Sequence, residues 1–177
     1  MNYPELASDL FHGSTVGVIE IDLSKGAYKK DFGKGFYTTS SKEQAEKFVG
    51  TKAHREHLDE GYVSVFTLPD YSDLKIKRYG EPTMEWLDFV LENRKLQKPG
   101  GRDEKFDIVI GPVADDAVGL VLNQLIIGTY GDTSSIEAKE TAIRLLKSSK
   151  LDNQVFFGTE KSIKNLIHKE VYRYAID

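Results

Sequence analysis

Residues 31–39 read Asp-Phe-Gly-Lys-Gly-Phe-Tyr-Thr-Thr. The residues after Gly35 are aromatic or β-branched, which predicts a strand entered from a glycine-rich turn. Gly33 and Gly35 precede this strand instead of joining a strand to a helix, so they do not form the Rossmann dinucleotide fingerprint. Two interpretations stay open. The glycines leave room for a flat ligand on which Tyr37 could stack, or Tyr37 fills the core behind an ordinary turn.

A second short stretch, residues 11–15, reads Phe-His-Gly-Ser-Thr. It predicts a strand that runs into a tight turn. The imidazole of His12, the backbone of Gly13 and the hydroxyl of Ser14 could bind one ligand together, because glycine has no Cβ to keep a ligand away. The alternative is that His12 is a partly buried histidine in an ordinary turn.

Helix and strand patterns follow one another irregularly along the rest of the chain. The sequence predicts helices at about residues 42–58, from Pro82 onward, and at 115–127, 135–147 and 160–167. It predicts further strands at 62–68, 74–79, 106–112, 154–157 and 169–174, and a loop over 16–31. Ser41 is the expected N-cap of the first helix, with Gln44 as its capping-box partner. Because the elements do not repeat as βαβ units, we expect one α+β domain over residues 1–177.

The composition narrows the classes of function. The chain has 177 residues, a formal net charge of −4 and mixed-sign charge throughout, so no basic face for nucleic acid is apparent. It contains no cysteine, which excludes disulfides, thiolate metal sites and thiol nucleophiles. The N-terminus lacks the pattern of a signal peptide, and the longest apolar stretch, 118–127, is too short to span a bilayer. We therefore expect a cytoplasmic protein that does not enter a membrane.

Taken together, the two glycine-containing stretches lie about 20 residues apart. His-Gly-Ser followed by Phe-Gly-Lys-Gly-Phe-Tyr and an alanine-containing helix resembles the diphtheria-toxin and poly(ADP-ribose) polymerase branch of the ADP-ribosyltransferases. More specifically, the chain resembles an uncharacterised bacterial family assigned to that superfamily and often encoded beside a small antitoxin. This likeness includes residues 85–90, residues 107–116 and the C-terminal strand pair. It implies an ADP-ribosyltransferase-like split β-sandwich with flanking and inserted helices, and NAD as the substrate.

The resemblance also implies a role for each residue of the two stretches. His12 would hydrogen-bond the adenosine-side ribose of NAD, and the Gly13 backbone would clamp the nicotinamide amide with support from Ser14. Tyr37 would stack on the nicotinamide ring, beside Gly35, and hold the glycosidic bond for cleavage. The resemblance implies no metal.

Gln154 is the main departure from the superfamily pattern. A glutamate usually opens the matching strand, where it bonds the nicotinamide-side ribose and stabilises an oxocarbenium-like transition state. Hydrogen bonds to charged groups contribute about 1.5–3 kcal/mol, against about 0.5–1.5 kcal/mol for neutral ones. A deficit of about 1–2 kcal/mol slows a reaction roughly five- to thirtyfold, and more in a dry site. Asp115 or Asp116 could supply the missing carboxylate, although one of them is expected to cap the following helix.

Other candidate residues have simpler interpretations. Arg94, together with Asn93, could reach a phosphate, but an exposed arginine at a helix end needs no such role. Trp86 and Phe89, one helical turn apart, are predicted to belong to the core. His54 and His57 lie on one helix face without a third ligand at a defined spacing, so we predict no metal site.

Two functions follow from these observations. The favoured one is an enzyme that cleaves NAD at the nicotinamide bond and transfers ADP-ribose to a macromolecular acceptor; the resemblance also implies a role as the toxin of a toxin–antitoxin pair, which is compatible with this function and with the next. The alternative is a catalytically weak or inactive module that binds NAD, ADP-ribose or a partner protein, which Gln154 motivates. Transfer of an RNA 2′-phosphate to NAD is a third interpretation, disfavoured because no set of arginines for it is evident.

Overall fold

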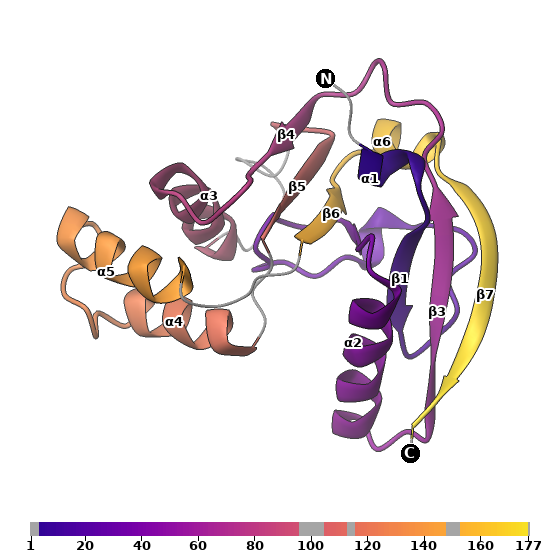
Figure 1. Ribbon diagram of the computed structural model, residues 1–177, viewed down its shortest axis with the longest axis horizontal. Helices are drawn as coiled ribbons and strands as arrows, with labels where there is room; N and C mark the ends of the chain where they lie inside the picture. Colours follow the sequence, from indigo (N-terminus) through magenta and orange to yellow (C-terminus); the bar gives the residue numbers. More distant parts are fainter. Residues whose placement is uncertain (1–3, 96–104, 113–115, 148–152, 177) are drawn as a thin grey trace.

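The computed structural model describes residues 4–95, 105–112, 116–147 and 153–176. Its strands form two sheets (Figure 1). The three-stranded sheet has the order β1 (Leu10–Ser14), β3 (Glu60–Thr67) and β7 (Ile167–Ala175), and all its pairs are antiparallel. The four-stranded sheet has the order β2 (Phe36–Thr38), β6 (Asn153–Phe157), β5 (Ile108–Pro112) and β4 (Ile76–Arg78). The predicted α+β class is confirmed.

One short contact joins the two sheets. The N–H of Phe11 on β1 donates to the carbonyl of Thr39 at 2.8 Å, and the N–H of Thr39 donates back to Phe11 at 2.9 Å. This bridge follows directly after β2, so it places the first and second strands side by side. The two stretches singled out from the sequence are therefore neighbours in space.

The helices cover the sheets at separate places (Figure 1). Helix α2 (Lys42–Arg55) packs on β1 and β3 through Ala45, Val49 and Val63. At the other end, α3 (Met84–Lys95) lies beside the paired helices α4 (Asp116–Ile126) and α5 (Ile136–Lys147). The short elements are α1 (Pro4–Ala7), the 3-10 helix Leu23–Lys25 and α6 (Glu160–Lys164). No helix among the residues that the structure describes is long and apolar enough to cross a membrane.

Two main apolar clusters hold these layers together. One lies between the sheets and includes Leu10, Phe36, Phe66 and Phe157. The other lies between the four-stranded sheet and helices α3 to α5, and it contains the buried side chains of Phe32, Trp86, Phe89, Val118, Leu122 and Phe156. The prediction that Trp86 and Phe89 belong to the core is confirmed, since their side chains are 0% and 2% exposed.

The ends of three helices differ from the sequence prediction. Helix α6 ends at Lys164 and not at residue 167, because the chain turns at Asn165 and β7 begins at Ile167. Helix α2 has the expected N-cap, since Ser41 Oγ accepts the Gln44 N–H at 3.2 Å, but it ends at Arg55. The predicted capping box is not formed, because Gln44 Oε1 accepts the Thr39 hydroxyl and the Ser41 N–H donates to Thr39 Oγ1 at 3.1 Å. His57 takes a left-handed conformation (φ 56°), and the Leu58 N–H donates back to the Ala53 carbonyl at 2.9 Å, which is a Schellman termination. Helix α3 begins at Met84 and not at Pro82, because Thr83 Oγ1 accepts the Trp86 N–H at 3.2 Å and caps the helix.

Candidate functional site

His12 lies on β1 and its ring reaches across to β2. Its Nδ1 is 2.7 Å from the carbonyl oxygen of Tyr37, and its ring packs against Phe36 with centroids 4.4 Å apart. Burial lowers the pKa of His12, and the charge of Lys52 lowers it further, against the opposing effect of the bond to Tyr37. The imidazole is therefore neutral at pH 7. Since a carbonyl only accepts, Nδ1 carries the proton and Nε2 is left as an acceptor.

This burial predicts a specific dependence of stability on pH. The pKa of His12 is lower in the folded state, so the unfolded chain takes up the proton first as the pH falls. The contribution of the neutral, buried His12 to folding stability is fully present above about pH 6.5, the ordinary pKa of histidine, and is lost as the pH falls below it. Between pH 6.5 and 5.5 we expect His12 to cost up to about 1 kcal/mol of stability. Urea unfolding at pH 7.5 and 5.5 should show a smaller loss in His12→Gln than in wild type. His54→Gln, at an exposed position on α2, should keep the wild-type difference, and equal losses in wild type and His12→Gln would contradict the assignment.

Gly13 is required where α2 crosses β1. A Cβ at this position would lie 2.6 Å from the Ala45 carbonyl oxygen and 2.8 Å from Val49 Cγ2. The space beside its Cα is therefore filled by the helix. The N–H and C=O of Gly13, in contrast, point sideways from β1. Phe11 uses its N–H and C=O for Thr39, so alternation along β1 turns the N–H and C=O of Gly13 away from β3 as well.

The backbone pairing between β1 and β2 at Phe11 and Thr39 does not extend to Gly13. Two residues beyond the Phe11–Thr39 bridge, antiparallel register would pair Gly13 with Tyr37. The carbonyl of Tyr37 instead binds the ring of His12, and among the described residues the bridge at Phe11 and Thr39 stands alone. The N–H donor and C=O acceptor of Gly13 therefore lie side by side, with His12 and Tyr37 next to them. Next to them, the hydroxyl of the nearly buried Ser14 lies 3.5 Å from the Val16 nitrogen.

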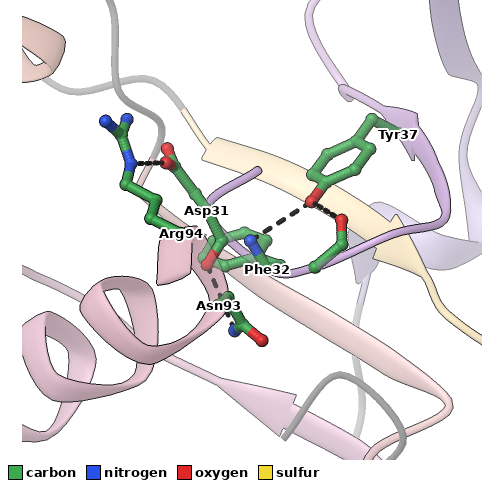
Figure 2. A network of polar contacts seen from close by, with 6 residues as sticks. Asp31, Phe32, Tyr37, Asn93 and Arg94 are labelled. Carbon is green, nitrogen blue, oxygen red and sulfur yellow. Dashed lines mark hydrogen bonds and ion pairs between the residues drawn. The ribbon is translucent and has the colours of Figure 1, made fainter. Parts of the chain in front are cut away.

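Tyr37 is half-buried and its hydroxyl is fixed by the preceding turn (Figure 2). The hydroxyl donates to the Gly33 carbonyl at 2.6 Å and accepts the Phe32 N–H at 3.2 Å. The ring also packs against Phe156, with centroids 5.0 Å apart. A glycine is needed at position 35 for this packing, because a Cβ there would lie 2.4 Å from both Phe156 Cε2 and the Phe157 carbonyl oxygen. The glycine-rich turn thus brings β2 close to β6, and Tyr37 stays only partly buried.

Gln154 lies on the strand next to Tyr37. In the register of β2 and β6, Tyr37 is opposite Phe156, and Gln154 is two residues further along β6. Side chains two residues apart on a strand share a face, so Tyr37 and Gln154 project from the same face of the four-stranded sheet. The structure therefore brings His12, Tyr37 and Gln154 together on three successive strands. The Gln154 side chain is half-buried.

A family model described as "Protein of unknown function (DUF3990)" matches residues 9–168. The chain belongs to the DUF3990 family. The match includes β1, β2 and β6, so all the candidate site residues lie within the shared family region. No curated protein and no solved structure matches the chain.

Sequence reasoning missed one polar network in this DUF3990 domain. Arg94 is not an exposed helix-end residue: its Nε lies 2.7 Å from Asp31 Oδ1, and both side chains are mostly buried. Asn93, which is 0% exposed, donates from Nδ2 to the Asp31 carbonyl at 3.3 Å. The only sequence signal was the position of Asp31 directly before the Phe-Gly turn, since its partners are more than 60 residues away.

Of the remaining sequence candidates, His54 and His57 do not join this site. Asp115 and the side chain of Asp116 lie outside the described residues. His54 and His57 are both exposed on or after α2. Within the described ranges, no three His, Asp or Glu residues are grouped so that they could hold a metal ion. The site is accordingly built from backbone groups, an imidazole, an aromatic ring and an amide.

Proposed function

We propose that this DUF3990 protein binds NAD where β1, β2 and β6 meet and cleaves its nicotinamide–ribose bond. The observation that carries the proposal is the edge of Gly13 between His12 and Tyr37, which pairs with no strand in the part of the chain that the structure describes. A carboxamide presents one acceptor and one donor side by side, as a neighbouring strand does. Nicotinamide therefore complements the N–H and C=O of Gly13, and in this proposal the Tyr37 ring stacks on the pyridine.

The other residues fit the remaining parts of NAD. The neutral His12 has Nε2 available to accept a bond from a ribose hydroxyl. Gln154, on the same face as Tyr37, has an amide that can bond the ribose next to nicotinamide. In this proposal the fold is an ADP-ribosyltransferase-like split β-sandwich, and the reaction takes place in the cytoplasm on a macromolecular acceptor.

The chemistry needs little from the protein beyond positioning. The bond between C1′ and the pyridinium nitrogen breaks, and its electron pair leaves with nicotinamide, which becomes neutral. A nucleophilic atom of the acceptor forms the new bond to C1′ and loses its proton to solvent. Holding the ring and the ribose in the reactive geometry supplies much of the rate enhancement. Nicotinamide release from NAD, measured together with NAD affinity by calorimetry, tests this proposal, and a purified protein that neither binds nor cleaves NAD would refute it.

Gln154→Glu should increase nicotinamide release roughly five- to thirtyfold. A carboxylate at this position places a negative charge beside the developing oxocarbenium ion, which is worth about 1–2 kcal/mol more than a neutral amide. Asn153→Asp is the matched control, because it adds the same charge one residue away, at an exposed position on the other face of β6. A loss of activity in Gln154→Glu would show that the glutamine itself is the working residue.

Gln154 also favours a second candidate function. A site with the carboxamide-binding edge but without a carboxylate can hold NAD or ADP-ribose without efficient turnover. Such a module would bind NAD by calorimetry with nicotinamide release at the uncatalysed rate. The Gln154→Glu variant separates the two, because a site that already holds NAD correctly should gain cleavage.

We further propose that the protein acts as a toxin restrained by an antitoxin protein, in line with the bacterial family that it resembles. Expression of the wild type without its genetic neighbours should arrest growth, because NAD is consumed or an essential acceptor is modified. Tyr37→Ala expressed at the same level should permit growth. Normal growth at high levels of the wild type would count against a toxin.

A further inference from the structure

The turn that holds the Tyr37 hydroxyl is itself fixed to a distant helix. Phe32 and Gly33 each hydrogen-bond the phenol, and Phe32 is 0% exposed. Gly33 has φ 102°, in the left-handed region that favours glycine, and its N–H closes a turn on Lys30 at 3.2 Å. The orientation of the Tyr37 ring therefore depends on the position of this turn.

Helix α3 fixes the turn from the other side (Figure 2). Arg94 binds the Asp31 carboxylate and Asn93 binds the Asp31 carbonyl, so consecutive helix residues bind the side chain and the backbone of the same residue. Two contacts to one residue define its position better than one. A continuous path of hydrogen bonds and backbone thus runs from α3 through residues 31–33 to the phenol of Tyr37.

The chemistry of Asn93 favours a positional role over a merely stabilising one. Its Oδ1 is buried without a hydrogen-bond partner in the described part of the chain. A buried polar atom without a partner opposes folding, so an apolar residue would serve stability better at this position. The amide nevertheless donates a hydrogen bond from α3 to the Asp31 carbonyl.

We propose that Asp31, Asn93 and Arg94 are positioning residues that set the orientation of the Tyr37 ring. This rests on the proposed function in one respect: the ring they orient is the surface on which nicotinamide stacks. The three residues contact no substrate in this account. They act through Phe32, Gly33 and the phenol hydroxyl, and loss of the anchor leaves the ring present but wrongly oriented.

The first test reads the ring directly and needs no NAD. The side-chain signals of Tyr37 are followed by NMR in protein labelled on its tyrosines, and Tyr37→Phe assigns them. Arg94→Gln should shift or broaden these signals, and Arg94→Lys, which keeps a cation beside Asp31, should restore them in part. Lys139→Gln is the matched control, because it breaks the Lys139–Asp88 pair of 2.7 Å, which also ends on α3 but does not touch the turn. Unchanged Tyr37 signals in Arg94→Gln would overturn the inference.

The second test measures nicotinamide release. Arg94→Gln should lower release about tenfold, Tyr37→Phe should lower it by a similar factor, and the double variant should be no worse than Tyr37→Phe alone. Multiplied losses in the double variant, or full release in Arg94→Gln, would overturn the inference while leaving NAD cleavage intact. If the wild type does not cleave NAD but Arg94→Gln still moves the Tyr37 signals, the positioning role is supported and the proposed function fails.

Discussion

Tyr37→Ala is expected to reduce nicotinamide release from NAD at least a hundredfold. The substitution removes the ring proposed to stack on nicotinamide, and a small misplacement of a reacting group already costs a factor of about 10². It also removes the hydroxyl that joins β2 to the turn at Phe32 and Gly33. Release is measured under saturating NAD, after the folded state has been checked by thermal unfolding.

Tyr130→Ala is the matched control for this experiment. Tyr130 is also half-buried, packs against the same apolar cluster, and bonds through its hydroxyl to Gln124. It follows α4 and is not part of the proposed site. We expect a comparable loss of stability with unchanged release. Tyr37→Ala with wild-type release would remove Tyr37 from the account.

Gly13→Ala is expected to destabilise the fold by about 2–3 kcal/mol. The added methyl group would meet a backbone carbonyl of α2 at 2.6 Å, and backbone cannot move aside as a flexible side chain can. Helix α2 must shift away from β1, which separates Ala45 and Val49 from the strand. The free energy of unfolding in urea measures the cost.

Gly50→Ala provides the contrast on the same helix. A Cβ there would have its nearest contact at 4.0 Å, from Tyr174 Cε1. Alanine also has the better helix propensity, so we expect a neutral change or a gain of up to about 1 kcal/mol. Equal effects of the two substitutions would show that the packing of α2 on Gly13 is not as tight as described.

The parts of the fold set by local chemistry could be predicted from the sequence. Ser41 marks the start of α2, because an N-cap hydroxyl and its bond to Gln44 involve residues three apart. The end of the helix could not be predicted, because it depends on a left-handed conformation at His57, which is uncommon for residues other than glycine. Thr83 was overlooked as a cap because the neighbouring proline is itself a common helix starter.

The candidate site was likewise predictable from the sequence only in part. The residue types at His12 and Tyr37 pointed to a shared site, and the bridge between Phe11 and Thr39 does bring their strands together. The physical reasons for Gly13 and Gly35 were not visible in the sequence, because each accommodates a segment far along the chain. The same holds for Arg94, whose partner Asp31 is separated from it by 63 residues. Tertiary contacts of this kind leave no local pattern.

The most direct test of the central claim is to follow the backbone amide of Gly13 while nicotinamide or NAD is added. In a ¹⁵N-labelled protein, the account predicts that the Gly13 signal moves with saturation, because its N–H gains the carboxamide oxygen as an acceptor. The amide of Gly119 on α4 should stay unchanged. A Gly13 signal that does not move at saturating NAD would contradict binding at this edge, and with it the proposed function.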